Sequence, residues 1–449
     1  MLRRLIVASP FALAALSALL LAPGCASKPE KPAPKPVAPI IVPKPVEPVP
    51  EPEILPTVML GIDVLEADGF KAIAGKKIGL LTHPAGVNRR GESTIDVLRR
   101  APQSKLVALF GPEHGIYGDE KAGDNIADMV DKRTKLPVFS LYGKNRKPTP
   151  AQLKGIDAMV IDLQDIGSRT YTFNVVMAYT IEACFDNGVE VIVLDRPNPL
   201  GGLKVDGPPL DPEWKSGVGA FRVPYVHGLT MGELARMAKE TPGVLPISEK
   251  IRQRGKLTVI PMRGWTRSMR WPETGLKWIA TSPMMPNFEA TVGYAMVGPG
   301  TEIGGWSSGI GTFYPFRGIG YQKKTPEQII SELGQYHIPG IRLDVAQGVG
   351  RDGKVIRGVY VEVTDWNAWH PTELSFYMMK TAAKWSPVNP FKAAPPDKQS
   401  MFNKIVGSAA WWKALTTQGA KVDVAQFTHN WNERALVYQQ QSRKFWLYQ

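Results

Sequence analysis

Short apolar runs alternate with amphipathic segments through the first half of the chain, from about residue 58 onward. Each run is too short for a buried helix and ends in polar or turn-forming residues, so we expect buried strands at 77–82, 106–110, 137–141, 157–162 and 189–195. Capping and stop signals predict helices at 93–100, 172–187 and 231–239. This alternation of strands with helices predicts an α/β fold built on a doubly wound parallel sheet.

The pattern changes near residue 250. A strand is expected at 257–262, and the following segments are rich first in aromatic residues, proline and methionine and then in glycine. Further on, the chain predicts a helix at 326–333, a strand at 359–364 and aromatic helices around Trp411, Trp412 and Trp431. We therefore expect two domains, at 58–250 and 251–449, of which the second is smaller and of α+β type.

The N-terminus has the features of an export signal. Arg3 and Arg4 precede an apolar stretch at 5–21, and small residues then lead to Cys25. This ending resembles a bacterial lipobox, so we expect a signal peptide at 1–25 and acylation of Cys25; an ordinary cleaved signal is the alternative. The proline-rich segment 26–57 is expected to be an extended tether. These features predict a cell-envelope lipoprotein, on the periplasmic face of the outer membrane.

The composition narrows the classes of function. With 43% hydrophobic and 21% charged residues the chain is typical of a globular protein, and its net charge of +13 is spread without a dense basic run, so no nucleic-acid partner is expected. No Gly-x-Gly-x-x-Gly or Walker motif follows a strand, and no His-Glu-x-x-His or Gly-x-Ser-x-Gly motif occurs. We therefore expect no cofactor and no metal, and serine hydrolase chemistry is disfavoured.

Reactive side chains follow the predicted strands where each strand ends. They are His83, Glu113 with His114, Asp162 with Asp165, and Asp195 with Arg196. Because the carboxyl ends of parallel strands meet at one edge of the sheet, these groups are expected to converge on one binding site. A partly buried carboxyl group there can have a raised pKa, so Glu113 is the candidate general acid; a structural cap or ion pair is the alternative.

The loop at 162–172 contains candidates for substrate binding. Arg169 offers two parallel donors to a carboxylate and Tyr171 offers a ring for stacking, as a carboxylate-bearing sugar would require. A structural pair between Asp165 and Arg169 is the alternative.

The loop at 195–202 also contains candidates for substrate binding. They are Asp195, Arg196 and Asn198, and two prolines fix the shape of the loop around them. A buried pair between Asp195 and Arg196 is again the alternative, and His227 can be either a ligand contact or structural. Carboxylates with aromatic residues, in a chain without metal or nucleotide motifs, favour glycoside hydrolysis.

Several segments together resemble the bacterial exo-β-N-acetylmuramidase family, formerly a family of unknown function. The matching strings are LFGPEHG at 109–115, SLYG at 140–143, DIGSR at 165–169, LDRPNPLGG at 194–202 and HGLTMGELA at 227–235. The resemblance implies a Rossmann-like N-terminal domain, a smaller C-terminal domain and a cleft between them. It also implies release of N-acetylmuramic acid from the non-reducing ends of peptidoglycan fragments, with Glu113 as the catalytic glutamate.

The chain departs from the family pattern at four positions. Tyr117 and Ile310 stand where the family has arginine, and Met284 and Gly305 stand where it has asparagine, while Glu302 is kept. We expect Glu113 to be assisted by His114, with Glu302 or Asp165 as the second group. The alternative is a non-catalytic lipoprotein that binds peptidoglycan fragments at the same place, and a third reading is a glycosidase for another amino sugar.

Overall fold

The computed structural model describes residues 57–118, 128–143, 145–312, 314–349 and 353–449. The predicted signal peptide, Cys25 and all but the last residue of the predicted tether lie outside this part of the chain. No helix within the described ranges has the length and apolar character needed to cross a membrane.

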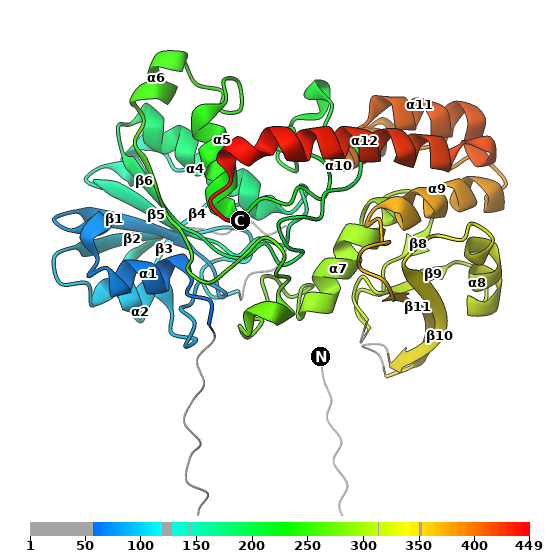
Figure 1. The fold of residues 1–449 in the computed structure, drawn as a ribbon, viewed down its shortest axis with the longest axis horizontal. Helices are drawn as coiled ribbons and strands as arrows, with labels where there is room; N and C mark the ends of the chain where they lie inside the picture. Colours follow the sequence, from blue (N-terminus) through cyan, green and yellow to red (C-terminus); the bar gives the residue numbers. More distant parts are fainter. Residues whose placement is uncertain (1–56, 119–127, 144, 313, 350–352) are drawn as a thin grey trace, which may run out of the picture. The chain divides into compact units, whose positions relative to one another are not determined.

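The first half forms a seven-stranded sheet in the order β3-β4-β2-β1-β5-β6-β7 (Figure 1). The strands are parallel except for β3, which pairs antiparallel with β4. Their bounds are β1 Lys77–Thr82, β2 Lys105–Gly111, β3 Met129–Val130, β4 Pro137–Ser140, β5 Ala158–Asp162, β6 Glu190–Leu194 and β7 Leu257–Ile260. The predicted parallel sheet is thus confirmed.

Side chains of the central strand β1 point alternately to two apolar cores. Ile78 and Leu80 pack in one core with residues of α1 (Gly61–Ala67) and α2 (Thr94–Arg99), while Leu81 packs in the other. That second core contains α4 (Thr172–Asp186) and α5 (Met231–Glu240). Helices therefore cover both faces, as the doubly wound prediction requires.

The second half contains a four-stranded antiparallel sheet in the order β10-β11-β9-β8. Its strands are β8 Trp306–Ser307, β9 Gly318–Tyr321, β10 Ile341–Val349 and β11 Val355–Val363. The remaining α-helices are α3 Pro150–Leu153, α6 Glu249–Arg254, α7 Phe288–Val297, α8 Pro326–Gly334, α9 Glu373–Trp385, α10 Pro396–Val406, α11 Ala409–Gln418 and α12 Val424–Ser442. Because β7 belongs to the first sheet, the predicted domain boundary near residue 250 falls before the last strand of that sheet.

After α12 the C-terminal residues return to the first half of the chain (Figure 1). The Leu447 amide donates to Glu233 Oε1 at 2.9 Å, and the Tyr448 hydroxyl donates to Asp195 Oδ2 at 2.6 Å. The Gln449 carbonyl accepts a hydrogen bond from the Arg267 amide at 2.8 Å. Residues 447–449 therefore complete the packing around β6, β7 and α5.

Candidate functional site

The order in which the chain adds strands to the first sheet changes direction between β1 and β5. From β1 the chain adds β2 on one side, and it later adds β5, β6 and β7 on the other. Such a reversal leaves a crevice beyond the carboxyl ends of the two strands, where open α/β sheets bind their ligands. The segments that follow β1 and β5 begin with His83 and Leu163, so the predicted site residues start at this point.

His83 is buried beside β5. Its Nε2 accepts a hydrogen bond from the Gln164 amide at 2.9 Å, and its ring meets Phe173 edge-on at 4.7 Å. Burial, which is the main cause, and the nearby Arg196 charge hold the pKa of His83 well below its usual value. The imidazole is therefore neutral, and because Nε2 accepts, Nδ1 carries the proton.

Glu113 lies in the tight turn after β2 and is half-buried. A Cβ atom at Gly111 would meet Gly115 Cα at 3.0 Å, so glycine at 111 allows this close turn. The Thr172 hydroxyl, in the first turn of α4, donates to Glu113 Oε2 at 3.1 Å. Glu113 thus lies against a helix N-terminus, whose partial positive charge attracts a carboxylate.

His114, next in the chain, is buried and has a φ of 72°. This left-handed conformation is uncommon for a residue with a Cβ atom. His114 belongs to the same tight turn after β2 as Glu113, and the prediction that it orients Glu113 is not tested by this conformation.

Asp165 and His227 face each other in the interior. His227 Nδ1 accepts from the Leu229 amide at 3.2 Å, so its Nε2 carries the proton when the ring is neutral. That Nε2 lies 3.7 Å from Asp165 Oδ2, which also accepts from the Gly167 amide at 2.9 Å. The separation of 3.7 Å is too long for a hydrogen bond, so the two side chains do not satisfy each other's hydrogen-bonding groups.

Five buried polar atoms around this edge have no hydrogen-bond partner within the described residues. The residues carrying them are linked, because Gln164 contacts His83, Asp165 faces His227, and Ser168 forms a bridge with Val226. Each such atom costs about 1–3 kcal/mol unless it finds a partner, so their convergence indicates a place that receives polar ligand atoms or water. The atoms are His83 Nδ1, Gln164 Oε1, Asp165 Oδ1, Ser168 Oγ and His227 Nε2.

Glu302 brings a carboxyl group from the second half of the chain. Burial raises its pKa to about 7, which a nearby Lys398 only partly opposes. Its charge contributes, after burial, to raising the pKa of Tyr294 to about 12, and the Tyr294 hydroxyl lies 3.1 Å from Thr170 Oγ1. Glu302 is therefore electrostatically connected to the loop at 162–172, and it has the pKa that a general acid needs near neutrality.

Arg169, a predicted substrate contact, is largely engaged inside the fold. Its guanidinium group is buried, and its two terminal nitrogens donate to four backbone carbonyls at 2.7–3.0 Å. It forms no ion pair with Asp165 among the described residues, and it joins segments more than 200 positions apart, while its role toward a substrate stays a prediction. Burial lowers its pKa to about 10, so it stays charged near neutrality. The carbonyls belong to Pro208, Val223, Ile405 and Val406.

Asp195 is also used inside the fold. It is fully buried, and its carboxylate accepts hydrogen bonds from four donors. Burial raises its pKa to about 6, although these donors oppose the shift. These hydrogen bonds hold the loop at Arg196, the start of α5 and the C-terminus around the carboxylate, and the predicted sugar contact of Asp195 stays a prediction. The donors are the amides of Arg196 and Gly232 and the hydroxyls of Thr230 and Tyr448.

Arg196 and Asn198 have internal partners as well. The Arg196 guanidinium donates to Asp162 at 2.5 and 2.9 Å and to the Val87 carbonyl at 2.6 Å. Asn198 bridges the backbones of Leu200 and Leu229. The role of these two residues in substrate binding stays a prediction, and the buried ion pair of Arg196 is with Asp162 instead of Asp195.

Tyr171 is buried at the edge of the candidate site. Its hydroxyl donates to Thr281 Oγ1 at 2.7 Å, and its ring meets Phe173 and Tyr294 edge-on. Burial raises its pKa above the usual value. A ring fixed on both sides in this way offers little free face for stacking on a sugar.

Sequence reasoning missed four polar residues of this region. Three of them lie in the segment 164–172, where hydroxyl and amide side chains are frequent, and this density could have indicated them. The fourth is a tyrosine in helix α7. The missed residues are Gln164, Ser168, Thr172 and Tyr294.

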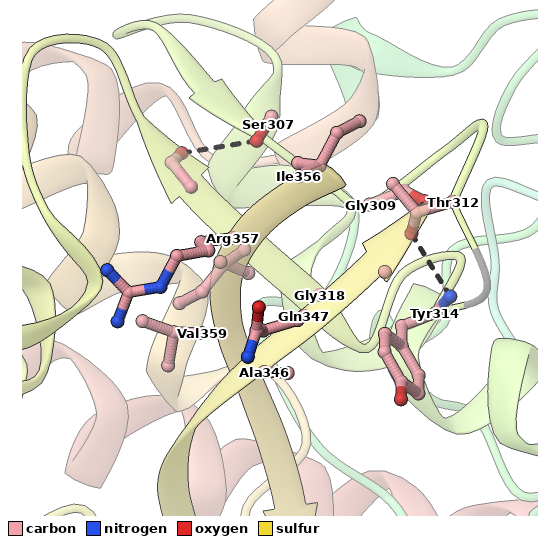
Figure 2. A pocket seen from close by; sticks show the side chains of 14 residues that line it. Ser307, Gly309, Thr312, Tyr314, Gly318, Ala346, Gln347, Ile356, Arg357 and Val359 are labelled. Carbon is pink, nitrogen blue, oxygen red and sulfur yellow. Dashed lines mark hydrogen bonds between the residues drawn. The ribbon is translucent and has the colours of Figure 1, made fainter. Parts of the chain in front are cut away.

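The segment after Glu302, where two departures lie, continues along the second sheet. Ile310 is 47% exposed, and the neighbouring residues border a cavity of about 70 Å³ (Figure 2). Thr312 closes the loop by donating to the Gly309 carbonyl at 2.7 Å and accepting from the Tyr314 amide at 3.1 Å. Tyr117, another of the four departures, follows the turn that contains Glu113, and its hydroxyl accepts a hydrogen bond from Arg133 Nε at 3.3 Å.

Comparison with known proteins identifies the family. Residues 78–289 match the family model described as "Exo-beta-N-acetylmuramidase NamZ, N-terminal", and residues 292–448 match the corresponding C-terminal model. The chain belongs to the NamZ family. The resemblance predicted from the sequence motifs is confirmed, and the two models divide the chain near residue 290. No cluster of three or more His, Cys, Asp or Glu side chains suited to a metal occurs among the described residues.

Individual NamZ relatives cover most of the chain. The peptidoglycan beta-N-acetylmuramidase NamZ of Bacillus subtilis (strain 168) is 38% identical over 374 residues, or 82% of this chain and 86% of the relative. A crystal structure of a DUF1343 family protein from Bacteroides fragilis NCTC 9343 superposes with a TM-score of 0.77 at 36% identity and covers 87% of this chain and 99% of its own. A second one from the same strain has a TM-score of 0.67 at 27% identity, with the same two coverages.

Proposed function

We propose that this chain is an exo-acting glycoside hydrolase that releases N-acetylmuramic acid from the non-reducing ends of peptidoglycan fragments. The observation that carries the proposal is the likeness to NamZ across both halves of the chain. The buried polar atoms without partners at the β1–β5 edge also support the proposal, because the hydroxyl groups of a sugar substrate would supply their missing hydrogen bonds.

The proposed general acid is Glu113. Because Thr172 donates to its Oε2, the other oxygen is left to carry a proton to the glycosidic oxygen as the bond to the leaving sugar breaks. His114 orients this carboxyl group. Glu302 is the proposed second carboxyl group, and its pKa of about 7 means that it exchanges a proton readily at neutral pH. Asp165, held by Gly167 and facing His227, is the alternative second group.

We further propose that the protein acts in the cell envelope, as a lipoprotein attached through Cys25 on the periplasmic face of the outer membrane. The support is the basic and apolar N-terminal segment that ends in small residues before Cys25. Within the tether, an extended proline-rich stretch from Pro29 to Pro56 would let the enzyme reach on the order of 80 Å from its anchor, at ~3.1 Å per residue.

The activity is tested with a chromogenic β-N-acetylmuramide. We expect Glu113→Gln to lower kcat about 10²–10⁴-fold, since the amide cannot donate the proton, while Glu213→Gln, on the exposed 3-10 helix Pro212–Trp214, keeps the wild-type rate. Equal release by wild type and Glu113→Gln would sink the assignment of Glu113.

Two other results would redirect the proposal. Retention on purified peptidoglycan without any sugar release would favour a non-catalytic binding lipoprotein. Turnover of N-acetylglucosaminides but not of muramides would show a glycosidase for a different amino sugar.

A further inference from the structure

A second pocket lies at the C-terminal end of α5. It has a volume of about 410 Å³ and is bordered by the loop at 209–222, by residues 241–244 after α5, and by residues 438–445 at the end of α12. The first turn of α5 contacts Asp195 at the sheet edge, whereas the pocket lies at its last turn, around Met237 and Thr241. Ten helical residues separate two positions by roughly 15 Å, so this pocket is distinct from the Glu113 site.

The charged residues that line this pocket are mostly cations. Lys215, Arg222, Arg434 and Lys444 border it, against a single carboxylate from Asp211. That carboxylate already accepts a hydrogen bond from the Ala409 amide at 3.0 Å. Cations from segments about 220 positions apart are thus brought together around one cavity, which favours an anion inside it.

The four cations are not equivalent. Lys215 donates to the Gly243 and Val244 carbonyls, and burial lowers its pKa, so it mainly secures the loop after α5. Within the described part of the chain, Arg222 and Arg434 form no ion pair or hydrogen bond through their guanidinium groups. Both are exposed and retain planar, forked donors that match carboxylate and phosphate groups.

The rest of the lining suits the non-charged part of an organic ligand. The Thr241 hydroxyl borders the pocket, is buried and has no hydrogen-bond partner among the described residues. Tyr438 and Phe445 supply aromatic surface on the opposite wall. The volume falls within the range of about 300–1,000 Å³ found for ligand pockets, and it exceeds what an isolated inorganic anion needs.

We infer that this pocket binds an amino sugar carrying a carboxylate or a phosphate, with Arg222 and Arg434 on the anionic group and the Thr241 hydroxyl and aromatic rings on the sugar. The choice of an amino sugar rests on the proposed function; the requirement for an anion rests on the lining of the pocket. A product of the reaction bound here would act at a place separate from the bond that is cleaved.

The test is isothermal titration calorimetry on the full protein with three ligands. N-acetylmuramic acid carries a carboxylate, N-acetylglucosamine 1-phosphate carries a phosphate, and N-acetylglucosamine is the neutral control. The double variant Arg222→Ala/Arg434→Ala is compared with Arg99→Ala/Arg254→Ala, which removes two exposed arginines from α2 and α6. Melting temperatures of both variants check that the fold is retained.

We expect at least one anionic sugar to bind wild type and the Arg99/Arg254 variant equally, and to bind the Arg222/Arg434 variant at least about tenfold more weakly. Neutral N-acetylglucosamine should show no such difference. The anionic sugar that loses affinity identifies the carboxylate or the phosphate as the ligand group. Identical isotherms for both double variants, or binding of neither anionic sugar to wild type, would overturn the inference. Since binding is measured without turnover, an inactive enzyme would not affect this result.

Discussion

Individual polar residues at the strand ends have opposite uses although they look alike in the sequence. The two terminal nitrogens of Arg169 and both carboxylate oxygens of Asp195 form hydrogen bonds within the protein, whereas Asp165 Oδ1 and His227 Nε2 are buried without partners among the described residues. The sequence shows which strand a residue follows, because that depends on local pattern. It does not show whether carbonyls at 405–406 will surround Arg169, because that depends on packing between distant segments.

The stability of the protein should depend on the ionisation of Glu302. Its usual pKa is 4.5 and burial raises it to about 7, so the folded state binds more protons than the unfolded state between these values. The stabilisation is present in full below pH 4.5 and is lost as the pH rises through 7. From the shift, the loss is at most about 3 kcal/mol.

Urea unfolding at pH 5 and pH 8 measures this loss for wild type and for Glu302→Gln. We expect the Gln variant to lose less stability between the two pH values, because its amide does not ionise. The exposed Glu213→Gln variant serves as control and should follow wild type. A wild-type pH dependence that Glu302→Gln leaves unchanged would contradict the assigned pKa.

At the scale of elements, α5 is fixed by an unusually close approach to the first sheet. A Cβ atom at Gly232 would lie 2.6 Å from Cγ1 of the half-buried Val259 and 2.7 Å from Cγ of the fully buried Asp195. At Gly334, the last residue of α8, the same atom would meet no atom within 4 Å.

Glycine-to-alanine substitutions at these two positions should therefore have opposite signs. We expect Gly232→Ala to lower the free energy of unfolding by about 1–3 kcal/mol through overpacking, and Gly334→Ala to raise it by up to about 1 kcal/mol. Urea denaturation of the two variants gives both values. A neutral Gly232→Ala would show that α5 can shift away from Asp195 without cost.

How far the elements could be predicted depends on their surroundings. The strand at 77–82 was placed correctly because its apolar run is short and both its ends are marked. Helix α7 gave no helical periodicity because it is apolar on nearly all sides, and seven of its residues are buried. Strand β10 carries an alternation of apolar side chains that was available in the sequence, but its antiparallel pairing with β11 also depends on contacts that the local pattern does not show.

At the scale of the whole molecule, the C-terminus holds the two halves of the chain together. The Tyr448 hydroxyl links Asp195 and the Met262 amide, and the Arg267 guanidinium lies 3.7 Å from the ring centre of Trp446. Family membership could be recognised from short motifs in the sequence. The contacts of the C-terminal residues could not be predicted in this way, because their partners are single residues spread over the chain.

Removal of the Tyr448 hydroxyl should destabilise the whole protein. Tyr448→Phe leaves the Met262 amide without its acceptor, at about 1–3 kcal/mol, and removes one of the donors to Asp195 Oδ2, which keeps its hydrogen bond from Thr230. Gln449→Ala is the matched control, since only the backbone carbonyl of Gln449 is used and its side chain is exposed. Equal melting temperatures for the two variants would show that the hydroxyl contributes nothing.

The return of the C-terminus also sets an order for biogenesis. The strands of the first sheet emerge early from the ribosome, but Asp195 and Glu233 receive Tyr448 and Leu447 only after residues 447 and 448 have been translated. A nascent chain therefore cannot complete this part of its interior before residue 448 is made. Under the proposed export of the protein, such late closure would leave the chain incompletely packed, and so easier to keep unfolded for transport, until that point of its synthesis.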